Sequence, residues 1–342
     1  MTIVQGLYYN SPPNASANFG ILQGLVSRGG RVTIPGQWDE AQQLWLPVPI
    51  QGQLGQWGSN RGTIVECDAI RVPELHFFNP PYNSCFTFAE PSPSGTQGLA
   101  HLRDMQLIYG PGQNGVLLIK HSGAMLHRMA MGNYSSEASG RADCGVRCRD
   151  SYGFSGDDLT FSGIAGPCID LAYTGGGEDL GRHNGTGNIA FIKKMNAYGC
   201  GSGRPAANGI YEVPPDAAIC IMADGFEIGP ANIEHCWAGI RMRNCVGGRI
   251  MAYIDACPVQ PGNLTQPIIF EGSMNSNILI QGFIAYSPDD AFPRFRVHHF
   301  DGVFMCEFPH MIVEIEQATC PHASTVIHPT CTFTKGAYVT YV

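Results

Sequence analysis

The sequence that decides the fold is a set of six short apolar segments: Val116-Leu-Leu-Ile119, Val146-Arg-Cys-Arg149, Ile169-Asp-Leu-Ala172, Ile210-Tyr-Glu-Val213, Ile240-Arg-Met-Arg243 and Ile268-Ile-Phe-Glu271. Their first residues are 30, 23, 41, 30 and 28 positions apart. In five of them an apolar residue stands at every second position, which is the pattern of a β-strand with one buried face. Glu212 breaks this alternation in the remaining segment, and indicates either a β-bulge or a buried functional acid.

A second series of apolar segments lies between these six and has a similar mean period. Its centres are Met105, Met129, Leu159, Met195, Ile228, Ile250 and Phe283. Two interleaved series with one period mean that each repeat contributes at least two strands. Repeats of roughly 20–40 residues are typical of solenoids, and short segments with a period of two exclude a helical solenoid. The sequence therefore predicts an all-β fold, a parallel β-helix.

Charged residues directly before these centres support the stacking of strands. The signs of six positions alternate along the chain: Asp104, Arg128, Asp158, Lys194, Glu227 and Arg249. Parallel strands in register lie about 4.8 Å apart, so neighbouring members would form ion pairs worth roughly 0.2–1 kcal/mol each. We therefore expect one ladder of alternating charge along the outside of the solenoid.

The composition excludes several classes of protein. Of the 342 residues only 14% are charged, the formal net charge is −8, and 44% are hydrophobic, which argues against disorder and coiled coils. No Lys/Arg-rich run favours nucleic-acid binding, and no apolar run is long enough to span a membrane. We expect no signal peptide, and we expect the thirteen cysteines to be reduced and mostly buried, as in a protein made in a cytosol.

The N-terminal region predicts a cap over the first open edge of the solenoid. Ile21–Val26 is a candidate for a short helix, and the segment Gly29-Gly-Arg-Val-Thr-Ile-Pro-Gly36 follows it. A turn at Leu54-Gly-Gln-Trp-Gly58 then leads into the strand Gly62–Cys67. This order resembles the start of pectate-lyase-like right-handed parallel β-helices, especially phage tailspikes. The resemblance implies a right-handed solenoid, here of roughly eight coils.

The C-terminal part, residues 309–342, loses the period. It ends in the apolar segment Ala337–Val342, which would aggregate unless another strand pairs with it. Pairing between subunits is the simplest solution, and the resemblance to tailspikes implies a homotrimer that closes at this end. The chain is therefore divided into a cap at 1–60, a parallel β-helix at 61–308 and an oligomerising segment at 309–342.

Long turns between strands carry the residues with the richest chemistry. Insertions are expected at 132–143, 173–188, 198–208, 214–224 and 257–266. One cluster combines Glu178, Asp179, Arg182 and His183 from a single turn with Asp157, Asp158, Lys193 and Lys194 from adjacent coils. Acids, histidine and Lys194 would act as catalytic groups, while Arg182 and Lys193 would bind a sugar. The alternative is a solvated, glycine-rich turn with salt-bridged neighbours.

Gly156-Asp157-Asp158 resembles the paired aspartates of polygalacturonases, which implies an inverting hydrolase with His183 as a further candidate. The sequence departs from that family at Arg182-His183-Asn184, where a histidine between two glycines is expected, and the charge ladder already accounts for Asp158. A polysaccharide lyase, with a lysine as the base, is a further alternative.

Two other groups of residues could bind ligands. Cys320, His322, His328 and Cys331 suit tetrahedral zinc, but their spacing is not that of a zinc finger, and a tail rich in Cys and His by coincidence explains them as well. We therefore expect no cofactor. Trp237, close to Glu234, could stack on a sugar whose hydroxyls the acid binds.

The function that these observations favour is that of a virion spike or fibre, a structural protein that recognises carbohydrate on the host surface, with or without cleaving it. Such a protein assembles in the host cytoplasm with other virion proteins, which reconciles a carbohydrate-type fold with the expected lack of an export signal. The alternative is a polysaccharide lyase or glycoside hydrolase that acts on an acidic polysaccharide.

Overall fold

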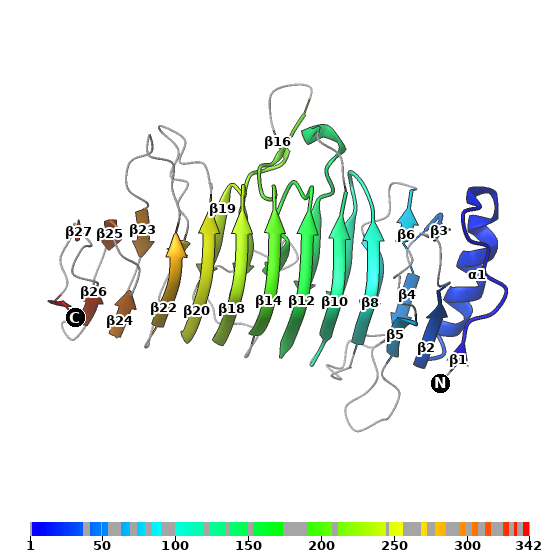
Figure 1. Cartoon of the computed structure of the whole chain (residues 1–342), viewed down its shortest axis with the longest axis horizontal. Coiled ribbons are helices and arrows are strands. Elements are labelled where there is room, and N and C mark those ends of the chain that lie inside the picture. Colours follow the sequence, from blue (N-terminus) through cyan, green and yellow to red (C-terminus); the bar gives the residue numbers. More distant parts are fainter. Residues whose placement is uncertain are drawn as a thin grey trace.

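The computed structural model describes most of the chain up to residue 255 and a series of strands beyond it. The described residues are 2–36, 42–48, 50–53, 63–68, 74–78, 84–89, 100–119, 123–133, 137–149, 153–173, 190–206, 211–243, 246–255, 268–271, 278–284, 294–297, 303–306, 312–315, 324–327, 332–333 and 338–341. They contain a single α-helix, α1 (Ala15–Val26), and most of the others are in β-strands (Figure 1).

Strands from successive turns of the chain form one long parallel sheet, which runs along the molecule (Figure 1). Its path is β1 (Thr2–Ile3), β2 (Gly30–Pro35), β5 (Thr63–Asp68), β8 (Ala100–Ile108), β10 (Met125–Gly132), β12 (Phe154–Ser162), β14 (Ala190–Tyr198), β18 (Asp224–Glu234), β20 (Val246–Asp255), β22 (Ile278–Ile284), β24 (Val303–Cys306), β26 (Ser324–Ile327) and β28 (Tyr338–Tyr341). Two further strands, β3 (Gln43–Leu46) and β6 (Glu74–Phe77), belong to the same sheet.

A second parallel sheet closes the solenoid, and the hydrophobic core lies between the two sheets. Its strands are β4 (Ile50–Gln53), β7 (Ser84–Ala89), β9 (Asn114–Ile119), β11 (Cys144–Arg149), β13 (Ile169–Tyr173), β17 (Ala217–Ile221), β19 (Ala238–Arg243), β21 (Ile268–Glu271), β23 (Arg294–Val297), β25 (Ile312–Ile315) and β27 (Thr332–Phe333). The strands β15 (Arg204–Pro205) and β16 (Tyr211–Val213) form a separate antiparallel pair, and η1 (Pro12–Asn14) and η2 (Ala138–Gly140) are short 3₁₀ turns.

The long sheet bends along a line through its middle. The strand β5 pairs with the first half of β8, and β6 pairs with the second half. Between the two halves, one residue on each of four successive strands has a left-handed backbone, with φ between 44° and 59°. These residues are Asp104, Arg128, Asp158 and Lys194. The bend gives the solenoid three faces instead of two.

We name these faces by their strand residues. Face A is the outer surface of 63–66, 100–103, 125–127, 154–157, 190–193, 224–228 and 246–250, before the bend. Face B is the outer surface of 74–77, 105–108, 129–132, 159–162, 195–198, 231–234 and 252–255, after the bend. Face C is the outer surface of the second sheet.

The predicted stacking of the apolar segments is confirmed for five of the six. Val116 pairs with Val146, and Val146 pairs with Ile169. Farther along, Ile240 pairs with Ile268. The side chains of Val146, Ile169 and Ile240 are fully buried, because each coil covers the apolar interior of the one before it. The fold is therefore the predicted right-handed parallel β-helix, but the expectation of roughly eight coils is too low, because eleven described strands stack in the second sheet.

The prediction for Ile210–Val213 is wrong, because β16 pairs with β15 in a hairpin outside both sheets. The coil strand at this place is β17, which joins β13 to β19. All five residues of β17 are buried, so it lacks the alternation that identifies the other coils. The insertion predicted at 214–224 is wrong for the same reason. Glu212 is neither in a bulge of the coil nor buried, since 56% of its side chain is exposed.

The charge ladder is confirmed along the bend. Nε of Arg128 lies 2.5 Å from Oδ1 of Asp104. Nζ of Lys194 lies 2.7 Å from Oδ1 of Asp158. The side chains whose charges alternate in the sequence therefore form ion pairs between adjacent coils, as the spacing of parallel strands requires.

Two members of the predicted ladder lie elsewhere. Glu227 and Arg249 are in register with each other, but Glu227 is level with Phe191 of β14 and not with Lys194. Gly229 and Pro230 occupy the bend of β18, since Ile228 is level with Ile192 and Ala231 is level with Met195. The alternating column along the bend therefore ends at β14.

The predicted N-terminal cap helix is confirmed, although it begins at Ala15 and not at Ile21, and the turn predicted at 54–58 lies outside the described residues. The amide of Gln23 on α1 accepts a hydrogen bond from the backbone N–H of Gln51 (2.8 Å) and donates one to its carbonyl oxygen (2.7 Å). Gln51 lies on β4, the last strand of its sheet. The helix thus occupies polar groups that would otherwise leave an open sheet edge.

At the other end, the described strands β25 to β28 continue both sheets in parallel register. The division of the chain at 60 and 308, and the role of 309–342 in oligomerisation, stay predictions. The cysteines whose side chains the structure describes are buried and free, as the sequence predicted: Cys67, Cys85, Cys144, Cys148, Cys168, Cys200, Cys220 and Cys236.

Candidate functional site

Half of the predicted catalytic cluster lies on face A and along the bend. Asp157 is in register with Lys193 on the next coil, and Asp158 is paired with Lys194. On the other side, Nδ1 of His127 lies 3.5 Å from Oδ2 of Asp157. Each acid of the pair therefore has a basic group on an adjacent coil, which is the arrangement of a structural ladder.

The other half of the cluster, and the predicted zinc ligands, lie outside the described residues. They are Glu178, Asp179, Arg182, His183, Cys320, His322, His328 and Cys331. Among the residues that the structure does describe, no three His, Cys, Asp or Glu side chains gather closely enough to hold a metal ion. Within the same residues, no helix has the length and apolar character needed to cross a bilayer.

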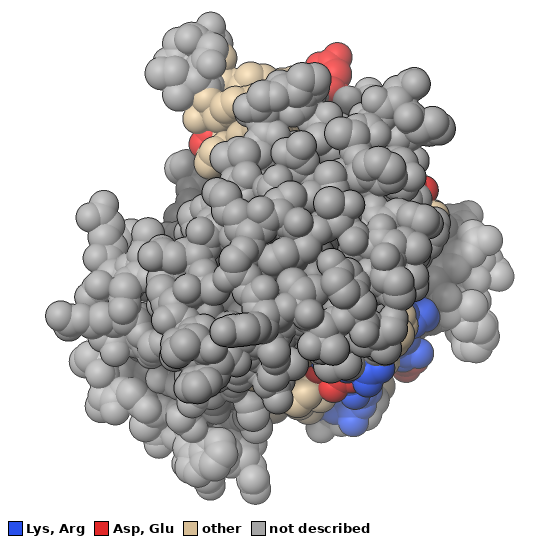
Figure 2. Space-filling model, turned by 90° about the vertical axis from the view of Figure 1, so that its left-hand side faces the viewer, with Lys and Arg blue, Asp and Glu red and all other residues tan. Residues whose placement is uncertain are grey.

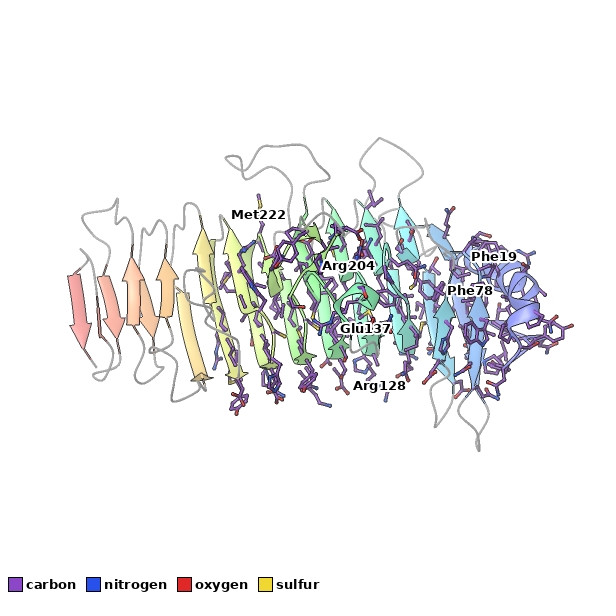
Figure 3. The ribbon with its side chains drawn as sticks, turned by 90° about the horizontal axis from the view of Figure 1, so that it is seen from above. Phe19, Phe78, Arg128, Glu137, Arg204 and Met222 are labelled. Atoms are coloured by element: carbon purple, nitrogen blue, oxygen red, sulfur yellow. The ribbon has the colours of Figure 1, made fainter. Side chains whose placement is uncertain are left out.

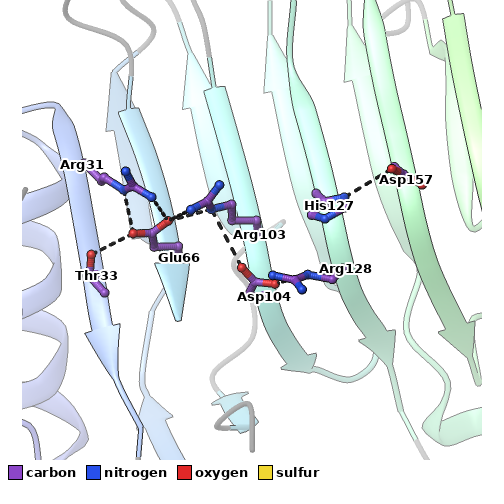
Figure 4. Close-up of polar contacts among 8 residues, drawn as sticks. All are labelled: Arg31, Thr33, Glu66, Arg103, Asp104, His127, Arg128 and Asp157. Atoms are coloured by element: carbon purple, nitrogen blue, oxygen red, sulfur yellow. Dashed lines mark hydrogen bonds and ion pairs between the residues drawn. The ribbon is translucent and has the colours of Figure 1, made fainter. Parts of the chain in front are cut away.

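Face A also carries a network around Glu66 of β5 (Figure 4). Arg31 donates hydrogen bonds of 2.7 and 2.9 Å to its two carboxylate oxygens. Nε of Arg103 donates a third of 2.6 Å, and the hydroxyl of Thr33 donates a fourth of 3.0 Å. These bonds, above all those from Arg31, lower the pKa of Glu66 to about 2 although burial opposes them. The carboxylate is an anion that ties together three consecutive strands.

Face A as a whole therefore balances acids with bases. In the end-on view of Figure 2, described basic and acidic side chains lie together at the lower right. Arg128, which belongs to the ladder, points outward from the coils (Figure 3). Such pairs stabilise the stacking of coils by small amounts, and they present a ligand with little unbalanced charge.

Face B differs, because it carries a hollow and few charges. The hollow has a volume of about 60 Å³ and crosses three coils. Its lining residues are Gln106, Ile108, Ala130, Met131, Gly132, Asn133, Thr160 and Ser162. The floor consists of small side chains. Gly132 has to be glycine, because its φ is 135° and a Cβ atom would lie 1.8 Å from the carbonyl oxygen of Ser162.

A raised segment borders this hollow. Nδ2 of Asn133 donates a hydrogen bond of 2.7 Å to the carbonyl oxygen of Gly140, at the end of η2. The adjoining hairpin β15–β16 protrudes beside it (Figure 1). Arg204 anchors the hairpin over the middle of the solenoid (Figure 3), since Nε donates to Glu212 at 2.9 Å and Nη1 contacts Asp143 at 2.5 Å. Only 7% of the Arg204 side chain is exposed, so this anchor is well shielded from solvent.

Farther along face B, exposed tyrosines flank two carboxylates. Tyr198, Glu234 and Asp255 are level with one another on β14, β18 and β20. The ring of Tyr198, which is 55% exposed, meets His235 edge to face with centroids 5.1 Å apart. The hydroxyl of Tyr253 donates to Oδ2 of Asp255 at 3.2 Å. Desolvation, and then the charge of Asp255, raise the pKa of Tyr253, so the phenol stays a donor at neutral pH.

This part of face B has the groups that bind polyhydroxyl ligands. Nδ2 of Asn232 holds one oxygen of Glu234 at 2.8 Å, which fixes the orientation of that carboxylate. An ionised carboxylate accepts several hydrogen bonds, so Glu234 and Asp255 can each bind a further hydroxyl. The exposed ring of Tyr198 adds an apolar surface for the C–H groups of a sugar. Face B is therefore the candidate binding site.

The sequence predicts that Glu234 and Trp237 bind a sugar, and of these two residues only Glu234 lies on face B. Trp237 is half-buried and packs on Ala217, Cys220 and Ala238, so its ring is not an open platform. On face B between β14 and β20, the exposed aromatic side chains among the described residues are Tyr198 and Tyr253. Alternation along β14 and β20 places both on the outside, and this signal could have identified them.

Comparisons with known proteins identify relatives by structure only. No family model matches the sequence, and no curated protein is similar to it. The tailspike of Acinetobacter phage vb_AbaP_AS12 has a TM-score of 0.53 and 12% identity, over 99% of this chain and 61% of that one. A protein of Geobacillus virus E2 has a TM-score of 0.41 and 11% identity, over 96% of this chain and 57% of that one. The endo-xylogalacturonan hydrolase of Aspergillus tubingensis has a TM-score of 0.35 and 10% identity, over 99% and 91%.

These similarities bear on the fold. The predicted resemblance to pectate-lyase-like parallel β-helix proteins is confirmed at that level, most clearly by the tailspike. This chain spans only about three fifths of the length of the two viral proteins. At such low identities, activity and partners have to be argued from the residues of this chain.

Proposed function

We propose that this chain is the β-helix of a virion spike or fibre, which recognises host-surface carbohydrate through face B. The observation that carries the proposal is the position of exposed Tyr198 level with Glu234 and Asp255, beyond a hollow with a floor of small residues. An aromatic ring and carboxylates bind complementary parts of a sugar, the C–H face and the hydroxyls.

The spike role is supported by the architecture of the solenoid. Each coil rests on the next, both sheets run along the whole molecule, and α1 covers one end (Figure 1). The fold similarity to a phage tailspike is consistent with this role. A spike of this kind is a homotrimer that joins other virion proteins after assembly in the host cytoplasm.

Binding and assembly can be tested together. Light scattering of the purified chain should give about three times 36.9 kDa, and a monomer would contradict the spike role. Binding to immobilised host-surface polysaccharide is then compared for wild type, Tyr198→Ala and Tyr8→Ala. Tyr8 is a matched control, because it is 51% exposed but lies in the N-terminal cap.

The expected result is a loss of affinity in Tyr198→Ala alone. Loss of one aromatic contact of about 0.5–1.5 kcal/mol corresponds to roughly twofold to twelvefold weaker binding. Equal affinities for wild type and Tyr198→Ala would show that the ligand does not bind at this part of face B. Absence of binding to every host polysaccharide would overturn carbohydrate recognition itself.

Cleavage of the bound polysaccharide is a second candidate function, and the in-register acids on face B favour it. Adjacent coils place the backbones of Glu234 and Asp255 about 4.8 Å apart. In a hydrolase, one acid protonates the oxygen of the breaking glycosidic bond, and water adds to the sugar carbon with help from the other. Cleavage is supported if the wild type produces new reducing ends from the polysaccharide and Glu234→Gln does not. If the wild type produces none, the protein binds the polysaccharide without cleaving it. A lyase or hydrolase that uses Asp157 and the residues around it on an acidic polysaccharide stays the alternative.

A further inference from the structure

We infer that the glycan of face B is neutral or contains amino sugars, and that face B rejects polysaccharides rich in uronate or sulfate. This inference rests on the proposed carbohydrate recognition and names its ligand class. It comes from the distribution of charge between two faces of the same sheet, together with the chemistry of the hollow.

The outward strand positions of face B between β8 and β20 carry no lysine or arginine among the described residues, although the exposed His235 follows Glu234 and meets the ring of Tyr198. They are Gln106, Ile108, Ala130, Gly132, Thr160, Ser162, Asn196, Tyr198, Asn232, Glu234, Tyr253 and Asp255. Ten of these twelve are uncharged, and the other two are acids. A carboxylate or sulfate on the ligand would therefore find hydrogen-bonding groups but no lysine or arginine at these positions.

Face A of these strands carries bases as well as acids. Its described bases, including those at the bend, are Arg103, Arg128, Lys193, Lys194 and Arg249, and Arg31 lies beside them on β2. Several of them contact acids on adjacent coils, as Arg31 contacts Glu66 and Lys194 contacts Asp158. The cations that an acidic ligand requires are thus gathered on face A, and some are already neutralised there.

Two acids on face B also repel an anionic ligand. Glu234 and Asp255 lie side by side, so an anionic sugar above them would meet two like charges. At 4 Å, two unit charges interact with about 1 kcal/mol in bulk water and with about 4 kcal/mol at a protein surface of effective dielectric near 20. Repulsion of this size weakens binding by at least about fivefold. An ammonium group on an amino sugar would gain the same interaction.

The hollow at the other end of the site is also neutral. The groups that can contact a ligand there are the amide of Gln106 and the hydroxyls of Thr160 and Ser162. Its volume of about 60 Å³ is well below the range for small-molecule pockets, so it is a shallow depression that a ligand covers and does not enter. From β12 to β20 the face spans three coil steps, or about 14 Å. A ligand that reaches from the hollow to the two acids is therefore an oligosaccharide that lies along the face.

The test uses the full chain on an array of bacterial surface polysaccharides in three groups, which are neutral, amino-sugar-rich and uronate-rich. Wild type is compared with the double variant Glu234→Gln/Asp255→Asn and with the matched face A variant Lys193→Gln/Lys194→Gln. Circular dichroism and thermal unfolding show whether each variant is folded, and each array is repeated at high salt to screen surface charges.

Wild type is expected to bind neutral or amino-sugar-rich members at least fivefold more tightly than uronate-rich ones. The face B variant should narrow this difference, and the face A variant should leave it unchanged. Preferential binding of uronate-rich members, weakened by the face A variant, would overturn the inference while carbohydrate recognition stands. Failure of the wild type to bind any group would overturn carbohydrate recognition, and the inference with it.

Discussion

Glu66 stabilises the first coils of the solenoid, and Glu66→Gln removes its charge with little change in shape. The side chain is only 7% exposed, and it accepts hydrogen bonds from Arg31, Thr33 and Arg103. These bonds hold its pKa near 2 instead of the ordinary 4.5, a difference that corresponds to about 3.4 kcal/mol. Both arginine side chains are 41% exposed, so solvent screening reduces the stabilisation to about 2 kcal/mol.

The effect has to depend on pH, because it arises from a carboxylate with a lowered pKa. Such a group contributes its full stabilisation above the pKa of the unfolded chain, about 4.5, and loses it as the pH falls toward 2. Glu66→Gln should therefore lower the free energy of unfolding by about 2 kcal/mol at pH 7, and by much less at pH 2.5.

Urea unfolding of wild type and Glu66→Gln at pH 7, 4 and 2.5 measures this difference. Glu137→Gln serves as the control, because Glu137 is exposed and should change stability by less than about 0.5 kcal/mol at every pH. A loss in Glu66→Gln that is equal at pH 7 and pH 2.5 would refute the role of the charge. No loss at pH 7 would refute the contribution of the network itself.

Three other substitutions test separate parts of the structure. Asp158→Asn should lower the free energy of unfolding by at most about 1 kcal/mol, and by less at high salt, because its ion pair is exposed and asparagine tolerates a left-handed backbone. If this variant loses glycan binding instead, Asp158 belongs to the binding site. Arg204→Met should speed proteolysis of the β15–β16 hairpin, and unchanged cleavage would contradict its anchoring role. Gln23→Ala should lower the free energy of unfolding by about 1–2 kcal/mol, because β4 loses the hydrogen bonds of its cap. The exposed strand edge should also promote aggregation, which light scattering measures.

The sequence predicts the solenoid well where one side of a strand is buried and the other is exposed to solvent. Val146 and Ile169, on strands 23 residues apart, were expected to stack and do so. The same period also predicted the ion pairs of Asp104 and Asp158, because residues at equal phase on parallel strands become neighbours.

The prediction fails where the surroundings of a strand change. The strand β17 is buried on both sides and so has no alternation, whereas Ile210–Val213 alternates without belonging to a coil. At β18 the two residues Gly229 and Pro230 occupy the bend, and the column of charge is interrupted there. A regular spacing of apolar centres does not reveal either change.

The candidate site was harder to predict, because its residues become neighbours only through the register in which the strands pair. Tyr198, Glu234 and Asp255 are separated by 36 and 21 residues, and only the pairing of β14, β18 and β20 makes them neighbours. An error of one residue in register would move each of these side chains to the opposite side of its strand. Residues with charged side chains were the natural candidates in the sequence, yet on face A those charges pair with one another. Face B is a better binding surface because residues such as Gly132 leave room on it and because most of its polar groups are neutral.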